Sequence, residues 1–329
     1  MDAAVSSAPP GFVDVVRDFL SAHHALRQLF ALFRAGSLRF EDLDPVFVDD
    51  ESSVLFRLKE RCHALFRPRS GRAREARHRE VLFDLAVGSL FHEVMKFREN
   101  FYQREVYGPQ VRALRAQAEP GAAALFGEFE KILDAVSARL DEGIEELEVL
   151  LGQTRSQLLL LLAEHADDGL VMRCALEHRT AVEEVFGRGL EALLGELHGG
   201  QPARGFAIAG RSYLESGHYA EAEWAFAAAA KHGGDPRELG RQASYARGMR
   251  AYLAGDYAES VAQLDAWANG AAAADAFLAA LAHAAVSKLD RLVQGRERAA
   301  TLRAAGALTA RLAGLRGADQ ASVAARRAQ

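Results

Sequence analysis

The feature that most constrains the fold is a long stretch without proline. Between Gly121 and Gln201 the chain contains no proline, while apolar residues recur at steps of three and four positions. This spacing places the apolar residues on one side of an α-helix and predicts a long amphipathic helix that runs to about Glu164. The apolar stripe consists of Leu125, Phe129, Ile132, Val136, Leu140, Ile144, Leu147 and Leu151.

A second long helix is expected after a turn at residues 165–169, so that two long helices run antiparallel. Its inward side would carry Leu176, Val182, Phe186, Leu190, Leu193 and Leu197.

The residues before this pair also read as helices. Helical spacing begins at Phe12 and stops near Gly36, and a shorter helix ends before Pro68. A third helix carries an apolar stripe and is expected to end at Gly108-Pro109. The only strand-like segment, residues 45–49, is too short and isolated to form a sheet, so we predict an all-α chain. The stripe of the third helix comprises Phe83, Val87, Leu90, Val94, Phe97 and Phe101.

The composition limits the possible partners. A net charge of −5 gives no general attraction to nucleic acids or anionic membranes. The basic stretch Arg67 to Arg79 holds six arginines without an aromatic residue that could stack on a base, so we interpret it as a solvated loop, with a phosphate or nucleic-acid contact as the alternative. With two cysteines, no signal peptide and no membrane-spanning segment, we expect a cytoplasmic protein that binds neither membranes nor nucleic acids.

Two similar segments follow one another after residue 203. They read GRSYLESGHYAEAEWAFAAAAKHGG and GMRAYLAGDYAESVAQLDAWANG. When Gly217 is aligned with Gly255, 38 residues apart, Gly210 aligns with Gly248, and a tyrosine stands two positions after each turn glycine. A repeat of this length predicts stacked helical hairpins.

These segments, about a quarter of the chain, resemble the tetratricopeptide repeat family. The first copy has the small and aromatic residues of that pattern at Phe206, Gly210, Tyr213, Gly217, Tyr219, Ala222, Phe226 and Ala229. The second copy departs from it, since Ala251, Ser260 and Trp267 replace a tyrosine and two alanines. A further helical stretch, residues 271–292, would cap the stack.

The resemblance implies a surface that holds a partner peptide or helix on the first helix of each repeat. We call this the first-helix face. Alternatively, the protein's own N-terminal helices or tail could fill it. By position it comprises Arg204, Arg211, Leu214, Glu215, Tyr245, Met249, Tyr252 and Leu253.

A second candidate surface lies on the helix that contains LFHEVMKFRENFYQREVY. Opposite its apolar stripe stand His92, Lys96, Glu99 and Gln103, at steps that share one helix side. We call these four residues the polar stripe. They form either an ordinary solvated side or a contact for a partner protein.

No motif points to catalysis. Nucleophile elbows, phosphate-binding loops and the zincin pattern are missing from the sequence. Cys62 and His63 are neighbours in a helix, where adjacent side chains diverge, and both cysteines read as core thiols. A di-iron bundle needs Glu-x-x-His pairs on facing helices. Glu75 with His78, among arginines, and Glu215 with His218, at a turn, have this spacing.

We therefore predict four segments: a disordered lead (1–11), a bundle of long helices (12–200), a repeat module with a capping helix (201–295) and a helical or disordered basic tail (296–329). The expected function is a non-catalytic adaptor or scaffold, without metal or cofactor, that captures another protein through the first-helix face and the polar stripe. A metal-binding bundle enzyme with a regulatory repeat module is the alternative. The sequence leaves homo-oligomerisation open.

Overall fold

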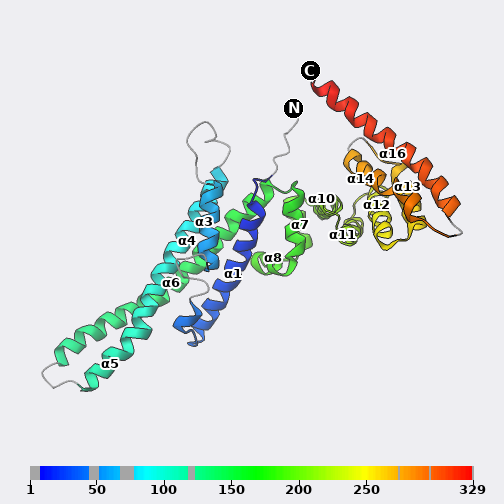
Figure 1. The fold of residues 1–329 in the computed structure, drawn as a ribbon. Helices are drawn as coiled ribbons and strands as arrows, with labels where there is room; N and C mark the ends of the chain where they lie inside the picture. Colours follow the sequence, from blue (N-terminus) through cyan, green and yellow to red (C-terminus); the bar gives the residue numbers. More distant parts are fainter. Residues whose placement is uncertain are drawn as a thin grey trace. The chain divides into compact units, whose positions relative to one another are not determined.

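A computed structural model describes residues 8–43, 52–66, 78–117, 123–272, 275–295 and 298–327. Within these ranges every regular element is helical and no strand occurs, which confirms the all-α prediction (Figure 1). Most of the predicted lead (1–7), the strand-like residues 45–49 and most of the basic stretch (67–77) lie outside the described residues. None of the described helices combines the length and apolarity needed to cross a membrane.

The chain divides into two compact units. Unit 1 comprises Met1–His165 and His178–Gly189, and unit 2 comprises Ala166–Glu177 and Leu190–Gln329. The boundary predicted near residue 200 therefore lies inside unit 2.

Unit 1 is built on two long helices, α4 and α6, that lie side by side and run in opposite directions (Figure 1). The apolar stripe predicted for α4 is buried at all six positions, which confirms that side as the core. The stripe packs on aromatic residues of neighbouring helices, as in the edge-to-face pair of Phe33 and Phe97 with ring centroids 5.4 Å apart. The elements of unit 1 are α1 (Phe12–Arg34), η1 (Phe40–Asp42), α3 (Val54–Phe66), α4 (His78–Tyr102), η2 (Gln103–Tyr107), α5 (Gly108–Gln117), α6 (Ala123–Glu164) and α8 (Arg179–Phe186).

The prediction that Gly108-Pro109 ends the third helix is wrong. The chain continues from α4 through the π-helical turn η2 into α5, and the Gly108 N–H donates to the Gln103 carbonyl. Pro109 is the second residue of α5, in the first turn of that helix, where a missing N–H costs little.

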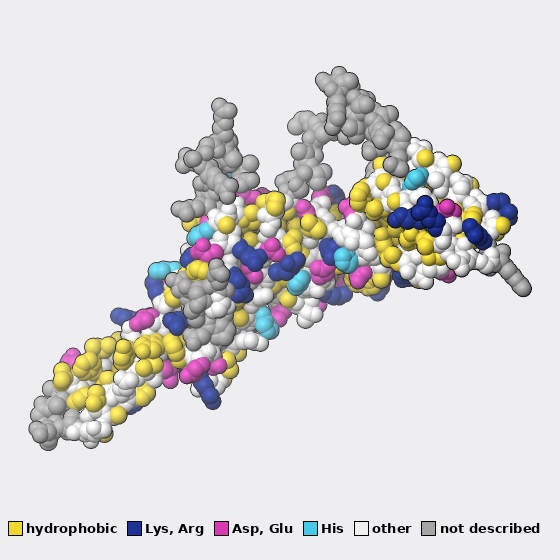
Figure 2. All heavy atoms as spheres, viewed as in Figure 1, with side chains coloured by type: hydrophobic (Ala, Val, Ile, Leu, Met, Phe, Trp, Pro, Cys, Tyr) yellow, Lys and Arg dark blue, Asp and Glu magenta, His cyan; other side chains and the backbone are white. Residues whose placement is uncertain are grey.

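The apolar stripe of α6 is only partly buried, although the spacing of its residues places them all on one side of the helix. Val136 and Leu140 are buried. Leu125, Phe129 and Ile132 are 60%, 44% and 56% exposed, and Figure 2 shows hydrophobic side chains on the surface at this end of unit 1. Periodicity identifies the apolar side of a helix, but only a helix packed against that side can bury it.

The predicted second long helix does not form. Residues 169–197 fold instead as three short helices, and Gly187 ends α8 with a left-handed φ of 64°. Since α8 belongs to unit 1 while α7 and α9 belong to unit 2, the apolar positions Val182 and Leu193 serve different cores.

Unit 2 contains two successive helical hairpins, α10–α11 and α12–α13, and α11 packs against α12. Gly217 and Gly255 adopt left-handed conformations between the helices of each hairpin, with φ of 79° and 83°. The elements of unit 2 are α7 (Gly169–Glu177), α9 (Leu190–Leu197), α10 (Pro202–Glu215), α11 (Tyr219–Lys231), α12 (Pro236–Ala254), α13 (Tyr257–Ala268), α14 (Ala276–Val286), α15 (Leu289–Leu292) and α16 (Arg298–Arg327).

Both hairpins are closest at the aligned glycines. A Cβ atom added at Gly210 would lie 2.7 Å from the Phe226 ring, and one added at Gly248 would lie 2.7 Å from Leu264 Cγ. Real Cβ atoms do not approach neighbours this closely, so both positions require glycine.

The third pair of helices does not repeat the arrangement of the first two. Whereas α11 packs against α12 of the next hairpin, the next second helix, α13, packs beyond its own partner α12 mainly against α16 and makes few contacts with α14. Leu308 and Leu312 of α16 are fully buried. The first half of the predicted C-terminal tail is therefore part of the packed unit.

Candidate partner-binding surfaces

The polar stripe of α4 is accessible. His92, Lys96 and Glu99 are exposed, and Gln103, in η2, is partly exposed. The Lys96 ammonium donates to Glu93 at 2.6 Å, and the Gln103 amide donates to Glu99 at 3.2 Å. The hydrogen bond to Glu93, with the negative charges of Glu93 and Glu146, raises the pKa of Lys96.

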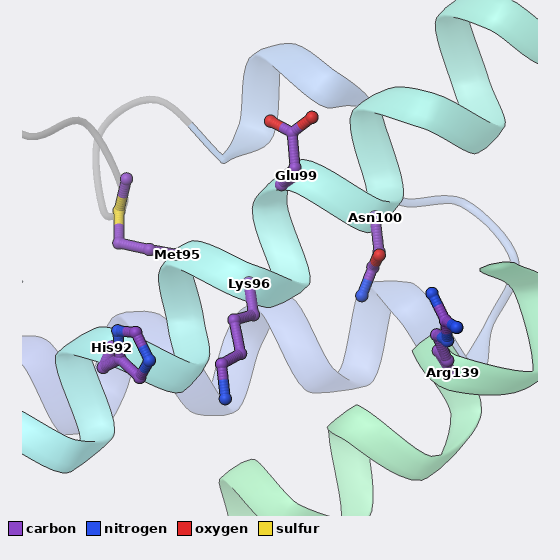
Figure 3. A pocket seen from close by; sticks show the side chains of 6 residues that line it. All are labelled: His92, Met95, Lys96, Glu99, Asn100 and Arg139. Atoms are coloured by element: carbon purple, nitrogen blue, oxygen red, sulfur yellow. The ribbon is translucent and has the colours of Figure 1, made fainter.

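Part of the polar stripe borders an open hollow of about 480 Å³ between α4 and α6. Figure 3 shows the side chains of Lys96 and Asn100 directed from α4 toward α6, whereas Glu99 points the other way. We call this surface the α4–α6 hollow. It is lined by His92, Met95, Lys96, Glu99, Asn100 and Arg139.

Arg139 is the residue of this surface that sequence reasoning missed. It stands on α6, three positions after the buried Val136, and forms no ion pair with a described residue. No sequence spacing relates it to Lys96, because the two residues meet only through the packing of α4 on α6. The hollow thus offers amide, ammonium and guanidinium donors, whereas the Glu99 carboxylate at its edge is directed away from α6.

The first-helix face is largely buried, which corrects the prediction at three positions. Leu214 and Tyr245 have no exposed surface, and Met249 is 7% exposed. The Tyr245 hydroxyl donates to the Leu278 carbonyl at 3.2 Å, and its ring packs edge-to-face on Trp267. Burial raises the pKa of Tyr245. These side chains therefore belong to the core, and the start of α14 lies against Tyr245.

Arg211 of this face is engaged by an aspartate of the same chain. The Arg211 Nη1 donates to Asp275 Oδ1 at 2.6 Å, and the Arg241 Nη1 donates to Asp275 Oδ2 at 2.9 Å. The Asp275 side chain is 3% exposed. Burial alone would raise the pKa of Asp275, but the hydrogen bonds from Arg211 and Ala272 and the charge of Arg241 outweigh burial and lower it.

The remaining positions of the first-helix face reach solvent. Arg204 is exposed and paired with Asp167 at 2.8 Å. Glu215 is exposed and accepts from Arg211, Tyr252 is partly exposed, and Leu253 is 70% exposed. A partner could therefore contact the ends of α10 and α12, but not the middle of the face.

The residues considered for chemistry do not assemble into a site within the described ranges. Cys62 and Cys174 are buried free thiols, as predicted for core cysteines, and burial raises the pKa of Cys62. His63 forms a hydrogen bond with Asp84, and its Nδ1 lies 2.7 Å from the Asp84 Oδ1. The described residues hold no group of three or more potential metal ligands, and Glu75 lies outside them.

One arginine of the basic stretch is described. Arg79, in α4, pairs with Glu164 of α6 at 3.2 Å, so it contributes to packing within unit 1. Comparison of the chain with protein-family models, with curated proteins and with solved structures finds no match.

Proposed function

We propose that the protein is a non-catalytic adaptor that captures a partner protein through the α4–α6 hollow and the accessible ends of the first-helix face. The observation that carries this proposal is the repetition of one helical hairpin, with glycine at the same crossing point, in α10–α11 and α12–α13. Stacked hairpins of this kind build extended surfaces suited to binding other proteins.

The α4–α6 hollow is the more accessible of the two surfaces. It is open rather than enclosed, which suits the surface of a macromolecule better than a small substrate. Its amide, ammonium and guanidinium donors provide polar contacts, and Met95 adds a flexible apolar surface. These properties support protein binding there.

A cross-linking experiment tests the proposal. Benzoylphenylalanine in place of His92 should cross-link a distinct partner from the protein's native cells, because His92 borders the hollow. Lys131 is a matched control, since it is an exposed polar residue of α6 that does not line the hollow. The proposal fails if the two positions cross-link the same proteins with the same yield.

A charge-reversal variant supplies a second criterion. Lys96→Glu with Arg139→Glu should remove the partner captured by the wild type, whereas Lys131→Glu should leave capture unchanged. Retention of the partner by the double variant would exclude the hollow as the binding surface. Stoichiometric iron or zinc in the purified protein would instead favour the alternative of a metal-binding bundle.

A further inference from the structure

We propose that Arg211 and Arg241 form a carboxylate-binding site on the first-helix face, occupied by this chain's own Asp275 until an acidic segment of a partner protein displaces it. This inference deepens the proposed function and rests on it, because it names the chemistry of a partner. The two arginines come from successive hairpins, Arg211 from α10 and Arg241 from α12.

The geometry is that of carboxylate recognition. Each arginine donates to a different oxygen of Asp275, at 2.6 and 2.9 Å. The guanidinium group presents several donors in a fixed plane, which matches a carboxylate and remains charged at every physiological pH. The Gln242 amide approaches the same carboxylate at 3.5 Å. Together these donors specify an oxyanion in a nearly dry position.

The side chain of Asp275 does not cap α14, the helix that it precedes. It occupies the N-cap position of α14, yet its side chain makes no capping hydrogen bond to that helix. It accepts instead from the backbone N–H of Ala272, at 3.1 Å. An N-cap aspartate usually bonds the first free amides of its own helix. Release of Asp275 from the arginines therefore breaks no hydrogen bond within α14.

The arrangement of the third helix pair explains why this aspartate reaches the first-helix face. Because α13 packs against α12 and α16 but makes few contacts with α14, α14 does not continue the stack of hairpins. Its start lies instead over α10 and α12, where Asp275 meets the arginines and the Leu278 carbonyl meets Tyr245. The start of α14 thus covers the positions that the repeat pattern predicts for a partner.

The arginines remain accessible to a competing carboxylate. Their side chains are 28% and 13% exposed, while that of Asp275 is 3% exposed. Glu215 also accepts from Arg211 at 3.0 Å and Glu238 from Arg241 at 2.9 Å, but both of these carboxylates are exposed. A glutamate or aspartate of a partner can therefore displace them at the surface and contact the arginines before Asp275 leaves. A peptide with several carboxylates gains from exchange, because each can replace the one that departs.

The test is a titration of fluorescein-labelled oligoglutamate with the full chain, followed by anisotropy at low salt. Asp275→Asn should bind the peptide at least tenfold more tightly than the wild type, because the internal competitor has lost its charge. Adding Arg241→Gln should abolish the gain. Asp265→Asn is the matched control, because Asp265 pairs with Arg311 elsewhere in unit 2. Equal affinities for wild type and a folded Asp275→Asn variant would overturn the proposal.

A measurement on the unmodified chain covers the case in which Asp275→Asn does not fold. Saturating oligoglutamate should speed hydrogen exchange at the Ala272 amide, because that amide donates to Asp275. Unchanged exchange there overturns the proposal. The proposed function is judged separately by cross-linking at His92, so either can fail alone.

Discussion

The two surfaces predicted to bind a partner differ in what covers them. The polar stripe of α4 remains in solvent and borders a hollow completed by Arg139 of α6. The first-helix face of the repeats is covered at its middle by the start of α14, which engages Arg211 and Tyr245. Both predictions used helical periodicity, which identifies the residues that share a helix side. Whether that side meets solvent depends on distant segments.

The largest expected effect distinguishes the covered middle of the first-helix face from its open end. Tyr245→Ala should lower the free energy of unfolding of unit 2 by about 3–5 kcal/mol, because it removes a fully buried aromatic side chain. Tyr252→Ala should cost about 1 kcal/mol, since this partly exposed ring has an aromatic contact with Tyr257.

Tryptophan fluorescence during urea unfolding measures both values. The two tryptophans of the chain, Trp224 and Trp267, lie in unit 2 and report on that unit. Similar costs for Tyr245→Ala and Tyr252→Ala would contradict the burial of the middle of the face.

The next effect tests the close crossing of the first hairpin. Gly210→Leu should destabilise unit 2 by about 2 kcal/mol or more, because the new side chain would meet the Phe226 ring. Gly240 is the matched control, since it is a helical glycine with no atom within 4 Å of an added Cβ. Gly240→Leu should leave stability unchanged or raise it by up to about 1 kcal/mol. If Gly210→Leu and Gly240→Leu changed the stability in the same direction and by the same amount, the close approach of α10 and α11 at Gly210 would be refuted.

A smaller effect, dependent on pH, tests the engagement of Arg211. Because the folded pKa of Asp275 lies below its ordinary value of 3.8, its contribution to stability is present above that value and is lost as the pH falls through the folded pKa. Asp275→Asn should cost about 1.5 kcal/mol at neutral pH. The difference from the wild type should shrink on acidification below about pH 4. A difference independent of pH would contradict the ion pairs.

The smallest effect is expected on the open surface. Lys96→Gln should leave the unfolding midpoint of the chain unchanged, because the Lys96 pair with Glu93 is exposed and solvent replaces it. Circular dichroism during thermal unfolding checks this expectation. A clear fall in the midpoint would indicate that the polar stripe supports the fold and is not a free surface.

The sequence predicted helices well where their periodicity was long, although the end predicted at Gly108-Pro109 was wrong. Helix α1, the buried stripe of α4 and the length of α6 followed from local pattern alone. The failures came from partners that no local pattern specifies. Residues 169–197 have the apolar spacing of one helix, but they form three short helices. Gly187 ends α8, and α8 packs in unit 1 whereas α7 and α9 pack in unit 2.

The candidate surfaces show the same limit. The solvated side of α4 could be predicted because Lys96 and Glu99 alternate with buried positions of one helix. Arg139 could not, because it meets α4 only in the folded unit. The ion pair of Arg211 could not be predicted either, because its partner, Asp275, lies 64 residues later in the chain. The repeat pattern identified the residues of the first-helix face but not the helix that covers them.

The most direct test uses methionines on the two surfaces. Met95 lines the α4–α6 hollow and is partly exposed, Met249 belongs to the first-helix face and is 7% exposed, and Met172 is a fully buried reference. Oxidation by dilute hydrogen peroxide, followed by peptide mass spectrometry, compares the three in one sample. We expect Met95 to oxidise quickly and Met249 to oxidise as slowly as Met172. Oxidation of Met249 at the rate of Met95 would show that the first-helix face is open and would contradict the account.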